Sequence, residues 1–171
     1  MNYKMIVLDL DGTLTNRDKI ITPRTKQSLM EAQKRGLKVV LASGRPTYGV
    51  MPLAEELELE TYEGYILSFN GGIIMNCRTK EILLKKELPV EANRRILELA
   101  RKEQVDVLTY EGAHILTNNP DNPYAKIESG INHLKLKKVE DLDSYLDFPV
   151  PKFLMLDDGD YLALVEARVK A

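Results

Sequence analysis

Apolar residues in the N-terminal part of the sequence form short runs, separated by stretches with helical spacing. Met5–Leu8 is a continuous run, whereas Leu37–Ala42 and Tyr65–Phe69 are mostly apolar and are each interrupted once, by Lys38 and by Ser68. Apolar runs of this length, flanked by polar residues, are typical of strands buried on both faces of a parallel sheet. We therefore expect three strands, and we expect the first one to be buried on both faces.

Two helices are predicted between these strands. Thr22-Pro23 supplies a cap and a first-turn proline for the first helix, and Gly36 ends it. The second helix covers residues 46–57 and places its apolar residues on one face. The order strand, helix, strand, helix, strand predicts an α/β fold with a parallel sheet and right-handed crossovers.

The pattern changes after the third strand. Gly71-Gly72 leads into a predicted hairpin over residues 73–84. The elements expected beyond it are a helix at 90–103, two short strands around Glu111-Gly112, a polar loop at 118–123, a short helix, a strand at 153–156 and a helix at 160–170. This α+β stretch predicts a second domain with a boundary near residues 84–89, which divides the chain into domains 1–86 and 87–171.

Composition excludes several classes of protein. Hydrophobic residues make up 44% of the chain and charged residues 29%, as in a folded globular protein rather than a disordered one. The formal net charge is −2, and no basic stripe with interleaved aromatics points to nucleic acid. Lys135, Lys137 and Lys138 are interpreted as solvated surface, because they lie among acidic neighbours.

The single cysteine and the N-terminal sequence bear on the compartment. Cys77 has no second cysteine to pair with, which fits a reducing environment. The apolar run at the start is short and interrupted by acids, unlike a signal peptide or a membrane span. We expect a cytoplasmic protein without a membrane partner.

Polar groups fall at the ends of all three predicted parallel strands. They are Asp9 and Asp11 after the first, Ser43-Gly44-Arg45 after the second, and Asn70-Gly71 after the third. Ligands of open parallel α/β sheets bind beyond the carboxyl ends of the strands, so three polar groups there predict a binding site.

Asp9 and Asp11 carry the candidate chemistry. Two neighbouring carboxylates both ionise at neutral pH only if a cation or hydrogen-bond donors compensate them, and Mg²⁺ prefers such oxygen ligands. One carboxylate can attack phosphorus to form an aspartyl phosphate, and the other can exchange a proton with the leaving oxygen and with water. The alternative, a polar strand end followed by a turn at Gly12, stays open for these residues alone.

The second and third strand ends fit an anion. The Ser43 hydroxyl and the backbone N–H groups near a helix start at Pro46 favour phosphate binding, although an ordinary cap with a surface Arg45 also explains them. Asn70 is either a substrate contact or part of the turn that enters the hairpin.

Together these motifs resemble those of a known family. The sequence reads D-L-D-G-T-L at 9–14, S-G-R-P at 43–46 and N-G-G at 70–72. It is similar to the haloacid dehalogenase superfamily, and in particular to its Cof-type branch of sugar-phosphate phosphatases. The resemblance implies a Rossmann-like core whose parallel sheet is incomplete here, with an α+β cap inserted after the third strand.

The resemblance also implies a role for each motif residue. Asp9 would be the nucleophile and a ligand of Mg²⁺, and Asp11 would be the general acid and base with its backbone carbonyl on the metal. The residues implied in binding phosphate or substrate are Gly12, Thr13, Ser43, Gly44, Arg45 and Asn70. The implied substrate is a small phosphorylated metabolite.

Two motifs of the family are missing after the cap, a lysine and an acidic loop that completes the metal site. Lys152 and Asp157–Asp160 are rejected for these roles, because they lie too close together; Asp158 or Asp160 is expected to cap the following helix. The first strand would also lack a neighbour on one side and form an exposed apolar edge. We therefore expect a chain truncated within its cap, impaired alone, and paired with a missing C-terminal segment or a second chain.

Two other functions stay open at this point. A phosphomutase would return the phosphoryl group to its product instead of passing it to water. A catalytically silent module would keep the phosphate pocket for binding or regulation.

Overall fold

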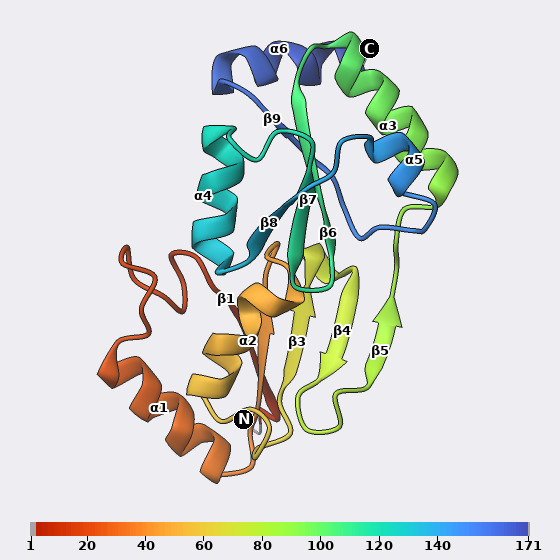
Figure 1. Ribbon diagram of the computed structural model, residues 1–171. Coiled ribbons are helices and arrows are strands. Elements are labelled where there is room, and N and C mark those ends of the chain that lie inside the picture. The colour runs from red at the N-terminus through yellow and green to blue at the C-terminus, as the bar shows by residue number, and fades with distance from the viewer. Residues whose placement is uncertain (1–2, 171) are drawn as a thin grey trace. The chain divides into compact units, whose positions relative to one another are not determined.

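The structure is a computed structural model that describes residues 3–170, and its contacts divide the chain into two compact units, Met1–Lys86 and Glu87–Ala171 (Figure 1). Every element predicted from the sequence is present. Among the described residues, no helix combines the length and the apolar character that crossing a membrane requires.

The first unit contains a five-stranded sheet with the order β1-β2-β3-β4-β5. The first three strands pair in parallel, as expected, and the hairpin of β4 and β5 continues the same sheet with antiparallel pairing. The strands are β1 (Met5–Asp9), β2 (Lys38–Ala42), β3 (Tyr65–Ser68), β4 (Ile73–Asn76) and β5 (Ile82–Lys85).

Two α-helices pack on one face of this sheet, α1 (Pro23–Lys34) and α2 (Thr47–Glu56) (Figure 1). The Thr22 side chain caps α1 by accepting from the Thr25 N–H, which confirms the predicted helix start. A short 3₁₀ helix (Phe69–Gly71) follows β3. Leu29 of α1 and Val50 of α2 are buried in one cluster with apolar side chains of the sheet.

β1 departs from the expectation of burial on both faces. It lies at the edge of the sheet, and within residues 3–170 its one partner strand is β2. Leu8 packs against the helix-covered core, but Met5 and Val7 are 50% and 56% exposed because they point to the opposite face. The expected exposed apolar edge is therefore confirmed, and the expectation that β1 is covered on both faces is wrong.

The second unit contains a four-stranded sheet with the order β8-β7-β6-β9. β6 pairs antiparallel with β7 and with β9, and β7 pairs in parallel with β8. The strands are β6 (Asp106–Glu111), β7 (His114–Thr117), β8 (Lys135–Lys138) and β9 (Leu154–Leu156). The helices are α3 (Val90–Lys102), α4 (Pro123–Asn132), α5 (Leu142–Tyr145) and α6 (Gly159–Lys170).

The sequence did not predict β8 and α5. β8 lies at a sheet edge and contains a single apolar residue among three lysines, so no alternating pattern marked it. Lys135 and Lys138 are exposed, and the Lys137 side chain is 41% exposed, so these lysines lie at the surface as interpreted. The Lys137 ammonium also donates to Glu111 at 3.0 Å and to the hydroxyl of Tyr145.

The segment rejected as an acidic metal loop caps a helix. The Asp158 carboxylate accepts from the N–H of Asp160 at 2.9 Å, at the start of α6. The Lys152 ammonium lies 5.5 Å from the ring centre of Tyr110. Both residues therefore have structural roles within the second unit.

Candidate active site at the strand ends

The register of the three parallel strands brings their carboxyl ends to one edge of the first sheet. Asp9 pairs with Ala42, and Ala42 pairs with Leu67. Backbone hydrogen bonds also join the loops that follow β2 and β3: the Ser43 N–H donates to the Leu67 carbonyl at 2.8 Å, and the Asn70 N–H donates to the Ser43 carbonyl at 3.1 Å. The polar groups predicted at three separate strand ends therefore form one region.

The chain turns sharply after β1 and is anchored by buried leucines. The N–H of Leu14 donates to the carbonyl of Asp9 at 3.1 Å, and Leu10 and Leu14 are both buried. Gly12 has φ +85°, with open space where a Cβ would stand, so backbone conformation rather than space requires glycine there. This turn leaves the Asp9 side chain exposed at the strand end.

The Asp9 carboxylate accepts few hydrogen bonds from the described residues. The hydroxyl of Thr13 donates to Asp9 Oδ2 at 3.3 Å. A carboxylate that is exposed and accepts one weak hydrogen bond retains lone pairs for a metal ion or an electrophile. This arrangement suits a nucleophile or a metal ligand.

The Asp11 carboxylate is bound by two cations. Arg45 donates from Nε to Oδ2 at 3.0 Å and from Nη2 to Oδ1 at 2.6 Å, and Lys19 donates from Nζ to Oδ1 at 2.7 Å. The hydrogen bonds from Arg45 chiefly, and those from Lys19, hold the pKa of Asp11 below its ordinary value, against the opposing effect of partial burial. Asp11 is therefore held as a carboxylate.

Lys19 is a site residue that the sequence did not reveal. It lies in a tight turn organised by Asn16, whose side-chain oxygen accepts from the N–H groups of Asp18 and Ile20, both at 3.0 Å. The polar run 16–19 signals a turn, but nothing in it tells which side chain reaches back to Asp11.

The loop after β2 passes very close to Asn70. A Cβ on Gly44 would lie 2.8 Å from Asn70 Oδ1, so any larger residue at position 44 would displace the Asn70 side chain. Asn70 itself has φ 57°, a left-handed conformation that asparagine tolerates. The Ser43 hydroxyl accepts from the Arg45 N–H at 3.1 Å, which holds the start of this loop.

The oxygen donors of this region fit part of a Mg²⁺ site. Asp9 offers an exposed carboxylate, and Mg²⁺ binds through few protein oxygens while keeping waters. Within residues 3–170, no group of three or more His, Cys, Asp and Glu side chains could hold a metal ion. Further ligands would have to be water, substrate or residues outside this range.

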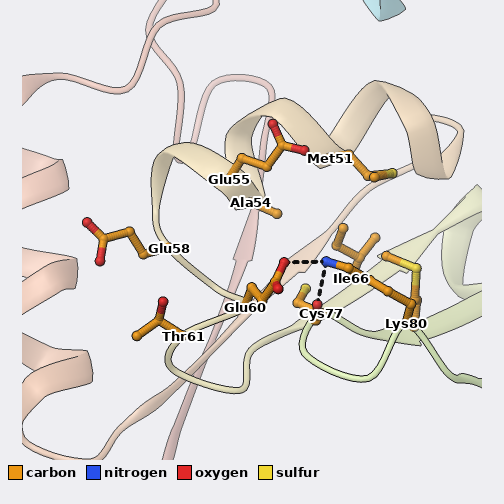
Figure 2. A pocket seen from close by; sticks show the side chains of 10 residues that line it. Met51, Ala54, Glu55, Glu58, Glu60, Thr61, Ile66, Cys77 and Lys80 are labelled. Carbon is orange, nitrogen blue, oxygen red and sulfur yellow. Dashed lines mark hydrogen bonds and ion pairs between the residues drawn. The ribbon is translucent and has the colours of Figure 1, made fainter.

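A separate cavity of about 320 Å³ lies beside α2 and β4 (Figure 2). Its floor is apolar and includes Met75 and the buried thiol of Cys77, whose pKa burial raises to about 11. Lys80 crosses it, donating to Glu60 at 2.8 Å and to the Cys77 carbonyl at 2.6 Å (Figure 2). No residue predicted for the active site lines this cavity, and its thiol is unreactive.

The identity of the chain follows from its similarity to known proteins. Residues 6–171 match the family of haloacid dehalogenase-like hydrolases. The chain belongs to this family. The match confirms the resemblance suggested by the three sequence motifs, and with it the expected α/β fold class.

Several relatives of this haloacid dehalogenase-like hydrolase are known. A crystal structure of a haloacid dehalogenase-like hydrolase from Bacteroides thetaiotaomicron shares 43% sequence identity and a TM-score of 0.92, over 98% of this chain and 63% of that one. YxeH of Bacillus subtilis (27% identical over 95% of this chain) and M6_Spy0533 of Streptococcus pyogenes (30% over 99%) carry names that class them with phosphatases.

The chain spans only 61% and 62% of the length of these two relatives. The motif regions 9–14, 43–46 and 70–72 all lie inside the family match. The family of the chain is thus established.

Proposed function

We propose that this protein is a Mg²⁺-dependent phosphatase that hydrolyses small phosphorylated metabolites, with sugar phosphates as the substrate class, through an aspartyl phosphate on Asp9. The observation that carries the proposal is the pair of carboxylates at the end of β1, with Asp9 exposed and Asp11 two residues further on. Family membership and the phosphatase names of the relatives support the reaction class.

In the proposed reaction, an Asp9 oxygen attacks phosphorus and the bond from phosphorus to the ester oxygen breaks. Asp11 gives a proton to that leaving oxygen, and then takes a proton from the water that attacks the aspartyl phosphate. Inorganic phosphate leaves and Asp9 is restored. When bound, Mg²⁺ would supply charge neutralisation, held by the Asp9 carboxylate and the Asp11 carbonyl.

The other strand ends would hold the phosphoryl group. The Ser43 hydroxyl and the Gly44 N–H are proposed to donate to its oxygens, and Asn70 to contact the substrate. For Asp11 to act as an acid, its carboxylate has to acquire a proton, although the hydrogen bonds of Arg45 and Lys19 favour the charged form. The negative charge of an incoming phosphate ester opposes this effect and favours protonation of Asp11.

We also propose that a segment outside this chain, or a second chain, completes the site and pairs with β1. The free edge of β1 and its exposed Met5 and Val7 support this proposal, because unpaired apolar edges are normally covered. By this account, residues 1–171 alone have weak activity.

The test is phosphate release from a panel of sugar phosphates with Mg²⁺, with and without a chelator, for the chain and its Asp9→Asn variant. We expect chelation and Asp9→Asn each to abolish release, and mass spectrometry to find a phosphoryl group on Asp9 in the unsubstituted chain. Release that is unchanged in Asp9→Asn would overturn the proposal.

A further inference from the structure

The ammonium group of Lys19 is hydrogen-bonded to Asp11 and also exposed to solvent. Its Nζ donates to Asp11 Oδ1 at 2.7 Å, yet the side chain is 48% exposed. An ammonium group has three donors, and Asp11 is the only partner of this one among residues 3–170. Two N–H donors therefore point toward solvent beside the candidate active site.

The position of Lys19 relative to the reacting atoms follows from the proposed function, on which this inference rests. A proton passes between Asp11 and the ester oxygen only if the two oxygens approach to about 3 Å. With the 2.7 Å contact between Lys19 and Asp11, the ammonium then lies within about 6 Å of the ester oxygen when Asp11 Oδ1 transfers the proton. That range includes a hydroxyl group on the carbon next to the ester oxygen.

Arg45 differs from Lys19 in its freedom to contact a leaving group. Its side chain is only 9% exposed, and its Nε and Nη2 donors are both directed at Asp11. A planar guanidinium in such a bidentate pair is geometrically fixed, whereas a lysine ammonium on a flexible stem can turn one donor to a new acceptor. Arg45 orients the carboxylate, and Lys19 is the cation that can contact substrate.

We propose that Lys19 is a specificity-determining residue that donates a hydrogen bond to a hydroxyl on the carbon next to the phosphate ester. It would favour phosphorylated polyols over plain alkyl phosphates. A hydrogen bond from a charged donor that stays partly exposed should be worth about a tenfold preference. A residue of the first unit would then contribute to specificity for the leaving group.

The test compares two esters that differ by one hydroxyl, 2-hydroxypropyl phosphate and propyl phosphate. Their dissociation constants are measured by calorimetry with Mg²⁺ on Asp9→Asn, which prevents turnover, and on the same variant carrying Lys19→Met, Lys19→Arg or the control Lys26→Met. Lys26 forms an ion pair with Glu56, so it controls for loss of a lysine.

We expect the hydroxylated ester to bind about tenfold more tightly to Asp9→Asn and to the Lys26→Met control. Lys19→Met should remove this preference while changing propyl phosphate binding much less, and Lys19→Arg should restore most of it. Equal binding of the two esters, or a preference that survives Lys19→Met, would overturn the role of Lys19. Failure of both esters to bind, with no phosphate release from the panel of sugar phosphates by the unsubstituted chain, would instead refute the proposed function and the inference with it.

Discussion

The contact between Arg45 and Asp11 gives a quantitative prediction for stability. We consider Arg45→Met, Asp11→Asn and the double variant, measured without metal in the presence of a chelator. Arg45→Met removes both guanidinium hydrogen bonds from Asp11 but keeps an apolar stem of similar length. Asp11→Asn removes the charge and keeps the shape. Comparing the double variant with the two single ones isolates the free energy of the pair.

The expected magnitude follows from the exposure of the two partners. A bidentate pair with an arginine that is 9% exposed would be among the stronger ion pairs, but the Asp11 side chain remains 40% exposed, and solvent screens it. Lys19 also stays in place to compensate Asp11 in Arg45→Met. We therefore expect a coupling free energy of unfolding of about 1 kcal/mol at neutral pH.

The pH dependence of this coupling has a definite sign. The pKa of Asp11 is lowered in the folded state from the ordinary value of 3.8. A depressed pKa gives stability that is present above the ordinary value and is lost as the pH falls below it. The coupling should therefore be constant at neutral pH and decrease once the pH falls below about 4.

Urea denaturation followed by circular dichroism, at a series of pH values, measures the coupling. A coupling indistinguishable from zero at neutral pH, or one that grows as the solution is acidified, would refute the reasoning. If Arg45→Met does not fold, the difference between the unsubstituted chain and Asp11→Asn tests the same pH dependence.

Four further substitutions test the fold. Gly12→Ala should cost about 1–2 kcal/mol of unfolding free energy because of its positive φ, whereas Gly130→Ala within α4 should gain about 0.5–1 kcal/mol; equal effects in urea denaturation would contradict this. Leu41→Ala should cost about 2–5 kcal/mol in the same assay because the side chain is fully buried, and a loss below 1 kcal/mol would count against the described core. Val7→Lys should weaken self-association of the chain in sedimentation experiments without unfolding it, since it places a charge on the exposed side of an edge strand.

The strand-end site could be predicted from the sequence because it depends on two simple regularities. Mostly apolar runs mark β1, β2 and β3, and parallel strands place their carboxyl ends at one edge. The sequence therefore predicted that the polar residues that follow each run, such as Asp9 and Ser43, would lie at the same edge of the sheet. Local hydrogen-bonding signals were equally dependable, since Thr22 and Asp158 both cap helices as expected.

The features that could not be predicted depend on contacts between residues far apart in sequence. Arg45 was expected near the substrate, but its 34-residue separation from Asp11 gives no sign that the two are bonded. Lys19 reaches Asp11 because the Asn16 side chain holds the turn that brings Lys19 back toward Asp11. Whether Val7 is covered depends on the neighbours of β1, which the apolar run itself does not encode.

The free edge of β1 also bears on how firmly the candidate nucleophile is held. Asp9 ends a strand that has a backbone ladder on one side only, so its order depends on β2 and on the burial of Leu10 and Leu14. Strands with few partners open locally at lower free energy than central ones, and their amides exchange with solvent sooner. Any polypeptide that pairs with this edge would slow that opening and stiffen the position of Asp9.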